Sequence, residues 1–393
     1  MNTKCFTIIL FIAAAFFTSC SNDDDVTTPV IPPSSGGIID PEVGGFNQAN
    51  RVYVDLSSGE QVASRRDSWE IAVYNGSQNR VFLNNALLVS AVELEGITDI
   101  TTVTETTALT SPLTLNALDQ NFTPTTVTVN TVAELMQGLP VGYFQYGDLD
   151  AGISFTDSKV GELAGTAFDE ISTTDSENNV YIVNLGNEIP TTNTGTLNTT
   201  GEPRGFMKVR VLADGNGYTI QYAPLTNTTD FSEISVSKDN SYNLTSISLT
   251  DGQVVSVEPE TANWDIDFGG VFSYYGLQGN LAAGLTYSDY TLHNTLGGVG
   301  LYQITVEDET TPSYTDFAIA NIDEASFVYN DRSIIGSSWR SVDYMTGETS
   351  VTEGRYYVIK DSDNNYYKLR FTAVENETGE RGYPQFQYEL LED

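Results

Sequence analysis

The sequence predicts an all-β protein, built as two tandem antiparallel β domains. Two observations favour strands. Apolar β-branched and aromatic residues alternate with polar residues over many short stretches, and only residues 131–136, which Gly138 and Pro140 follow, have the pattern of a short helical turn. A third observation, the return of the same strand motifs in the second half, predicts the tandem arrangement.

The strand signal is clearest near the start of the body. Val52, Val54 and Leu56 alternate with Tyr53 and Asp55. A second alternating stretch covers residues 69–73, and the Asn-Gly-Ser turn at 75–77 separates it from a third strand at 80–83. Residues 46–229 are therefore predicted to be the first β domain.

The second half repeats the order of these motifs. An alternating strand running into a glycine turn occurs at 51–61 and again at 244–254, followed by W-E-I-A-V at 69–73 and W-D-I-D-F at 264–268. A Tyr-led strand and a K-x-R strand then close each half, at 181–184 and 208–210, and at 357–360 and 368–370. The order predicts a duplication.

The spacing between the last two motifs differs between the halves. The K-x-R strand follows the Tyr-led strand after 27 positions in the first half and after 11 in the second. The additional residues of the first half, the surplus segment, fall on residues 188–203, which are rich in Thr, Asn, Gly and Pro. Surface loops accept such insertions at a small cost in conformational entropy. We place the boundary near 226–230 and the second domain at 230–393; two unrelated β domains remain the alternative.

Composition excludes several classes of protein. With 53 acidic and 17 basic residues the formal charge is −36, which opposes binding to nucleic acid. The chain has one His, His293, and two Cys, Cys5 and Cys20, so multi-His and cysteine-rich metal sites are excluded. Neither a G-x-S-x-G elbow nor a phosphate-cradling motif occurs, and the protein is predicted not to be an enzyme.

The N-terminus has the form of an export signal. Lys4 precedes an apolar stretch, residues 6–17, that is too short to span a membrane and ends at Thr18-Ser19-Cys20. This order resembles the bacterial lipobox, which implies cleavage after residue 19 and lipidation of Cys20. Residues 21–25, which include Asp23, Asp24 and Asp25, resemble the acidic signal for the outer face of the outer membrane, and the Pro/Gly/Ser-rich remainder of 20–45 is predicted to be a flexible tether.

The repeated W-[DE]-I strand and the closing hairpin at 356–371 resemble the HmuY-like family of Bacteroidetes surface lipoproteins, in two tandem copies. The resemblance implies an all-β fold, haem as cofactor and iron acquisition through an outer-membrane, TonB-dependent receptor. In the founding member two His hold the iron, and Met replaces His in relatives. This sequence departs at that point, because it has only one His.

The remaining ligand candidates are His293 and the Met residues of the mature chain. Met207 and Met136 lie among apolar neighbours and are predicted to pack in cores. Met345 lies in a predicted hairpin turn, so we predict that the second copy binds haem through His293 and Met345. Arg332, Arg340 or Arg355 would pair with the haem propionates.

Two hypotheses for the function remain open. The first is a haem or tetrapyrrole carrier. The second is an adhesive surface module that has lost haem ligation and binds a glycan or a protein through aromatic loops containing Tyr274, Tyr275 and Tyr287. The D-x-D-x-N segment at 361–365 lacks the glycine and the final Glu of a calcium loop, and a hairpin turn is predicted there instead.

Overall fold

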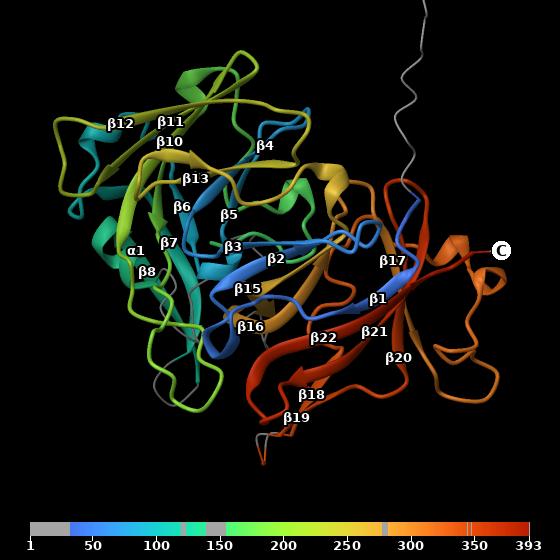
Figure 1. Ribbon diagram of the computed structural model, residues 1–393. Helices are drawn as coiled ribbons and strands as arrows, with labels where there is room; N and C mark the ends of the chain where they lie inside the picture. Colours follow the sequence, from blue (N-terminus) through green and yellow to red (C-terminus); the bar gives the residue numbers. More distant parts are fainter. Residues whose placement is uncertain are drawn as a thin grey trace, which may run out of the picture. The chain divides into compact units, whose positions relative to one another are not determined.

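The computed structural model (Figure 1) describes residues 32–118, 123–138, 155–276, 282–343, 345–346 and 348–392. The chain divides into two compact units, Met1–Pro32 and Pro33–Asp393, and everything described below belongs to the second. Regular structure in these residues is almost entirely β-strand, which confirms the all-β prediction.

Four antiparallel sheets of four or five strands make up most of the described part of this unit. The first outer sheet has the order β12 (Ser232–Ser237), β11 (Gly217–Pro224), β10 (Phe206–Asp214), β9 (Val180–Asn184), β6 (Ser90–Leu94). The first inner sheet has the order β14 (Gln253–Val255), β13 (Leu244–Ser248), β4 (Ile71–Tyr74), β5 (Val81–Leu83). The second inner sheet has the order β16 (Ala282–His293), β15 (Ile266–Gly276), β2 (Asn50–Val54), β3 (Gln61–Arg65). The second outer sheet has the order β1 (Gly36–Ile39), β22 (Arg381–Leu390), β21 (Tyr366–Glu375), β20 (Arg355–Lys360), β17 (Gly300–Thr305).

Smaller elements connect the sheets. Two hairpins are formed by β7 (Ala108–Leu118) with β8 (Pro124–Thr131) and by β18 (Arg340–Val342) with β19 (Thr349–Val351). The α-helix in the described part, α1 (Val132–Gly138), confirms the predicted helical turn. Short 3-10 segments lie at Gly45–Asn47, Asn85–Leu87, Ile100–Thr102, Leu163–Gly165, Asp175–Glu177, Thr261–Asn263, Ile319–Asn321 and Glu324–Ser326.

Three apolar cores hold the four sheets together as layers. Ile71 and Val73 of the first inner sheet pack with Val209 and Val211 of the first outer sheet. The second inner and second outer sheets share an equivalent core, which contains residues such as Val52, Phe268, Leu369 and Phe386. A middle cluster joins the two inner sheets and consists of Tyr53, Trp69, Ala72, Phe82, Val257 and Trp264.

The central strands β2 and β4 of the inner sheets are therefore buried on both faces, whereas the edge strands β3 and β14 are partly exposed. Val52 and Val54 of β2 point into one core, whereas Tyr53 between them belongs to the middle cluster. Trp69 and Trp264 are both buried in that same cluster, where the two halves of the sequence meet. The period-two pattern identified the strands, but it did not show that both of their faces are covered.

The two predicted repeats exchange strands. β2 from the first half pairs with β15 from the second, and β13 from the second half pairs with β4 from the first. The edge strands are also exchanged, since β1 pairs with β22 and β12 with β11. The predicted division at 229/230 lies in the connection between β11 and β12, and the duplication stays a prediction; strands from both stretches pair within one compact unit.

Buried carboxylates also connect each half of the chain to the other. Glu70, after Trp69, accepts a hydrogen bond from the backbone N–H of Leu249 at 2.6 Å. Asp265, after Trp264, accepts one from the backbone N–H of Leu56 at 2.8 Å. Each W-[DE]-I motif thus anchors the glycine turn of the other half of the chain.

The predicted tether is shorter than its composition indicated. Residues 36–39 form β1, which pairs with β22 from Gly36↔Glu389 to Ile39↔Phe386. β1 covers an edge of β22 that would otherwise leave backbone groups unpaired, and that edge is formed far away in the sequence. Cys20 and the export signal lie outside the described residues.

Candidate functional site

His293, the one imidazole of the chain, is the last residue of β16 and is only 1% exposed. Its backbone N–H donates to the carbonyl of Arg332 at 3.0 Å, and ring Nε2 lies 3.2 Å from the carbonyl oxygen of Val328. Nδ1 has no partner among the described residues. Burial lowers the pKa of His293 to about 4, so the ring is neutral near pH 7.

Met345 lies in a very different environment. It follows β18 in the turn before β19, its side chain is 95% exposed, and its backbone N–H donates to Asp343 at 2.7 Å. His293 lines a buried cavity to which Met345 does not contribute. The structure therefore does not bring these two predicted ligands together. Met207 and Met136 pack against apolar cores, as predicted.

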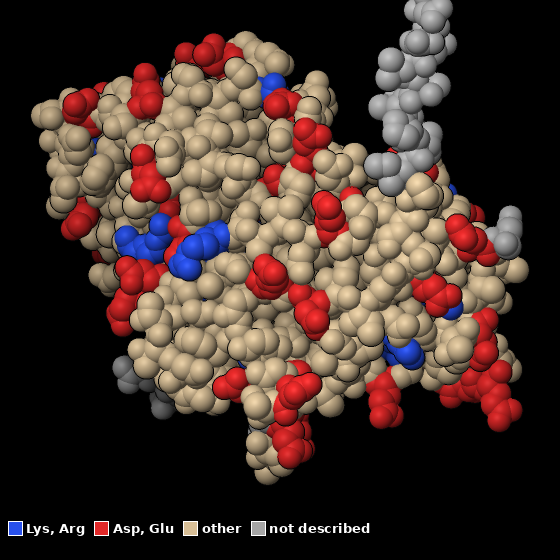
Figure 2. All heavy atoms as spheres, in the orientation of Figure 1, with Lys and Arg blue, Asp and Glu red and all other residues tan. Residues whose placement is uncertain are grey.

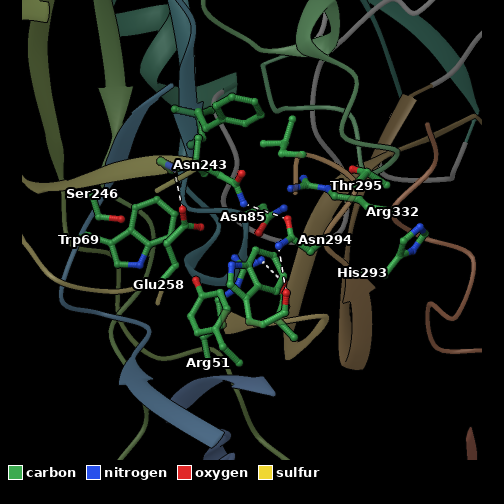
Figure 3. Close-up of a pocket in the computed structure, with 17 residues that line it drawn as sticks. Arg51, Trp69, Asn85, Asn243, Ser246, Glu258, His293, Asn294, Thr295 and Arg332 are labelled. Carbon is green, nitrogen blue, oxygen red and sulfur yellow. Dashed lines mark hydrogen bonds and ion pairs between the residues drawn. The ribbon is translucent and has the colours of Figure 1, made fainter. Parts of the chain in front are cut away.

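The cavity beside His293 lies between the two inner sheets (Figure 3) and has a volume of about 40 Å³. Its lining comprises Arg51, Tyr53, Trp69, Phe82, Leu83, Asn85, Asn243, Leu244, Ser246, Glu258, Trp264, Asp267, His293, Asn294, Thr295, Leu296 and Arg332. Such a volume has room for two or three water molecules at about 10–15 Å³ each. It is far below the ~300–1,000 Å³ of typical ligand sites, so this cavity cannot hold a tetrapyrrole in the described conformation.

Charged groups in the cavity wall are strongly desolvated. Arg51 and Asp267 form an ion pair at 2.8 Å, and both side chains are nearly inaccessible. Glu258 accepts a hydrogen bond from the backbone N–H of Leu244 at 2.6 Å, and burial raises its pKa to about 7. The indole Nε1 atoms of Trp69 and Trp264 have no partner among the described residues, which fits a cavity that holds water.

The three arginines predicted to pair with propionates are held by protein groups. Arg332 donates to the carbonyls of Lys159 at 3.2 Å and Ser158 at 3.5 Å, while burial lowers its pKa. Arg340 pairs with the buried Asp289 at 3.0 Å, and Arg355 donates to the carbonyl of Ser338. All three side chains therefore already bind protein groups.

A larger groove, which the sequence did not predict, lies between the surplus segment 188–203 and the β21–β22 hairpin. It has a volume of about 380 Å³, within the range of ligand sites. Its lining comprises Phe46, Asn193, Gly195, Thr196, Leu197, Val342, Glu375, Gly379, Glu380, Arg381 and Tyr383. The unequal spacing of the two repeats was the signal in the sequence that could have located one wall of this groove.

The tyrosines of the predicted aromatic loops are only partly among the described residues. The side chains of Tyr274 and Tyr275 lie outside the described part, whereas Tyr287 contacts Tyr290 with ring centroids 5.6 Å apart. Within the described residues, no group of three or more His, Cys, Asp or Glu could hold a metal ion. In the same residues, no helix combines the length and hydrophobicity needed to cross a bilayer.

Comparison with known proteins gives one match of broad extent. The sequence matches the family model described as HmuY protein over residues 47–388, and no curated protein matches it. Similar solved structures include a candidate lipoprotein of Bacteroides fragilis, with 12% identity and a TM-score of 0.19, covering 47% of this chain and 96% of the other. They also include the apo HmuY analog of Tannerella forsythia, with 16% identity, a TM-score of 0.17 and coverages of 44% and 89%. For apo PinO from Porphyromonas gingivitis the identity is 14%, the TM-score 0.16 and the coverages 46% and 94%. Structural likeness at this level carries no argument about function.

Proposed function

The chain belongs to the HmuY family, and from this membership we propose that it is a non-enzymatic, lipid-anchored surface protein that captures haem or a related tetrapyrrole. The observation that carries the proposal is the family match over residues 47–388, which extends through both predicted repeats. Captured haem would then pass to a TonB-dependent receptor in the outer membrane.

The anchor follows from the N-terminal sequence. Lipidation of Cys20 would attach the protein to the outer membrane, with residues 21–32 as spacer before the compact unit that begins at Pro33. Labelling of cells with a radioactive fatty acid should mark the wild-type protein and not the Cys20→Ser variant. Equal labelling of both would contradict the assignment of Cys20.

For the iron ligands we retain His293 and Met345 as the proposal. Neutral imidazole is the form that binds iron, and burial keeps His293 neutral near pH 7. Because Nε2 faces the carbonyl of Val328 and the ring is buried, the segment around residues 328–332 would have to open before iron could reach it. Met345 needs no such opening, because its thioether is exposed.

The experiment is a haemin titration of the whole mature chain, followed through the Soret band. Wild type should show a saturable band shift. His293→Gln, which keeps a donor for the Val328 carbonyl, and Met345→Leu, which keeps an apolar side chain, should each change the position of the band. Absence of any shift in the wild type would refute haem capture and leave a surface module with another ligand.

If the wild type binds haem and both variants give the wild-type spectrum, the ligand assignment fails while the proposed function stands. A Tyr phenolate would then be the next donor to test, since it is another known axial ligand.

A further inference from the structure

The surplus segment 188–203 is held in place although the fold does not need it. In the second repeat the corresponding strands β20 and β21 are joined by the short turn at residues 361–365, in which the N–H of Asp361 donates to the carbonyl of Asn365 at 3.0 Å. In the first repeat the connection from β9 to β10 contains the whole surplus. One repeat therefore folds the same pair of strands without it.

Contacts from elsewhere in the chain fix this segment. The N–H of Asn198 donates to the carbonyl of Phe46 at 2.9 Å, and the side-chain amide of Asn47 donates to the carbonyl of Pro190 at 2.9 Å. Arg66 also binds it, through the carbonyl of Thr199. The segment and the Gly45–Asn47 turn thus form one wall of the groove together.

A buried arginine, Arg66, holds this surface segment in place. Its side chain is almost completely buried, and burial lowers its pKa to about 10. Its other hydrogen bonds end on the carbonyls of Gln48 at 2.9 Å, Ala86 at 2.8 Å and Asn47 at 3.3 Å. These hydrogen bonds join the segment at Thr199 to the turn at residues 47–48 and to Ala86, so they fix the position of this wall.

The opposite wall comes from β21 and β22 and is fixed equally well. Arg381 pairs with the buried carboxylate of Asp289 at 2.5 Å. Gly382 has a φ of +94° and lies against the carbonyl of Gly45, so a side chain at that position would overlap backbone atoms. A groove with two fixed walls is preorganised and loses little entropy when a ligand binds.

The groove combines an aromatic platform with hydrogen-bonding groups. Tyr383 is 45% exposed although it is a large aromatic residue within a strand, and Phe46 and Leu197 add apolar surface. Asn193, Thr196 and Glu380 bring amide, hydroxyl and carboxylate groups to the same hollow. A ligand that fits must present an apolar face to a ring and many hydroxyl groups at its edge.

The charge of the groove further restricts the class of ligand that can bind. Glu375 and Glu380 line it, and the one cation of its lining, Arg381, shares the carboxylate of Asp289 with Arg340. The chain as a whole has a net charge of −36, and acidic side chains are spread over the face shown in Figure 2. Anionic ligands are therefore disfavoured in this groove.

We propose that this groove binds an uncharged saccharide, with a sugar ring stacked on Tyr383 and its hydroxyl groups bound by Asn193 and Glu380. The C–H face of a sugar is apolar and its rim consists of hydroxyl groups, which is the combination that the groove offers. This site is distinct from the cavity beside His293, and it stands whether or not the protein binds haem.

The test uses the whole mature chain and an array of neutral glycans, followed by calorimetry with the best binder. Chitotetraose, cellotetraose and maltotetraose serve as first probes, with tetragalacturonate as the anionic control. At least one neutral saccharide should bind, and tetragalacturonate should bind at least tenfold more weakly. No binding on the array, or tighter binding of the anionic probe, would overturn the proposal.

Variants locate the site. Tyr383→Ala should weaken binding of the neutral saccharide at least tenfold, and Glu380→Gln or Asn193→Ala should weaken it several-fold. Tyr329→Ala is the matched control, because Tyr329 is 44% exposed and does not line the groove. Unchanged binding by Tyr383→Ala, with a melting temperature equal to that of the wild type, would refute the stacking site.

A haemin titration of the same samples separates this proposal from the preceding one. Tyr383→Ala should lose saccharide binding and keep the wild-type Soret response, whereas His293→Gln should do the reverse. Loss of both ligands in both variants would show a single shared site and would also overturn the proposal.

Discussion

At the scale of residues, the centre of the molecule is notable for charges that are buried with few partners. Arg51 and Asp267 neutralise each other, whereas Glu258 is stabilised mainly by N–H donors at the start of β13. Burial outweighs those hydrogen bonds and the attraction of Arg51, so the pKa of Glu258 rises from an ordinary 4.5 to about 7.

This shift makes stability depend on pH. A raised pKa favours the protonated folded form, so the stabilisation from Glu258 is complete below about pH 4.5 and is lost as the pH rises to about 7. Glu258→Gln should match the wild type near pH 4 and exceed it near pH 8 by about 3 kcal/mol in free energy of unfolding. Urea denaturation at several pH values measures this difference. A difference that is constant with pH would contradict the assignment.

At the scale of elements, the two halves of the chain exchange strands. β1, β2 and β3 come first in the chain but complete the sheets of the second half. Phe268 and Phe386 stack with centroids 5.6 Å apart in the core that β2 closes. Val52, Val54 and Leu56 each contribute about 1.5–3 kcal/mol by burial, a sum comparable with the ~5–15 kcal/mol stability of a whole domain.

Removal of these strands should therefore unfold a distant part of the chain. A variant that lacks residues 33–65 should lose hydrogen-exchange protection in β15 and β22, more than 200 residues away in the sequence. Deletion of residues 21–32, which precede the compact unit, is the control and should leave protection unchanged. Retained protection in β15 after the longer deletion would show that the second core does not need β2.

At the scale of the whole molecule, the exchange determines which fragments can fold. Residues 33–229 would lack β13 and β14 of the first inner sheet, and residues 230–392 would lack β1, β2 and β3. We expect neither half to give a cooperative, monomeric unfolding transition alone, and a mixture of the two to form a folded 1:1 complex. Circular dichroism and light scattering after size-exclusion chromatography test this; two independently folded monomers would contradict it.

The net charge of −36 gives a salt dependence that we expect of the proposed haem capture. Haem propionates are anionic, so the field of the protein repels them at low ionic strength. Shortening the screening length from about 30 Å at 0.01 M salt to about 8 Å at 0.15 M should raise the association rate several-fold. Stopped-flow absorbance measures the rate. A rate that falls with added salt would indicate a local basic entrance that outweighs the overall charge.

The candidate site could be predicted only in part. Residue type singled out His293 as the one possible imidazole ligand, and the local sequence placed Met345 in a turn, where the structure shows it 95% exposed. That His293 is buried while Met345 lies in an exposed turn could not be read from the sequence, because it depends on segments from residues 328–332 packing over the end of β16. The groove at Tyr383 was also missed, because its walls lie far apart in the chain.

The sequence by itself determined the strand content, the order of the repeated motifs, the acidic surface and the form of the N-terminal signal, since each depends on neighbouring residues or on composition. Only the tertiary structure decided which strands pair, which side chains share a core, and where a ligand could fit. The physical reason is that the hydrogen-bonding edge of a strand accepts many partners of similar pattern. Burial of both faces of the inner sheets selects one arrangement, and that selection depends on the whole chain at once.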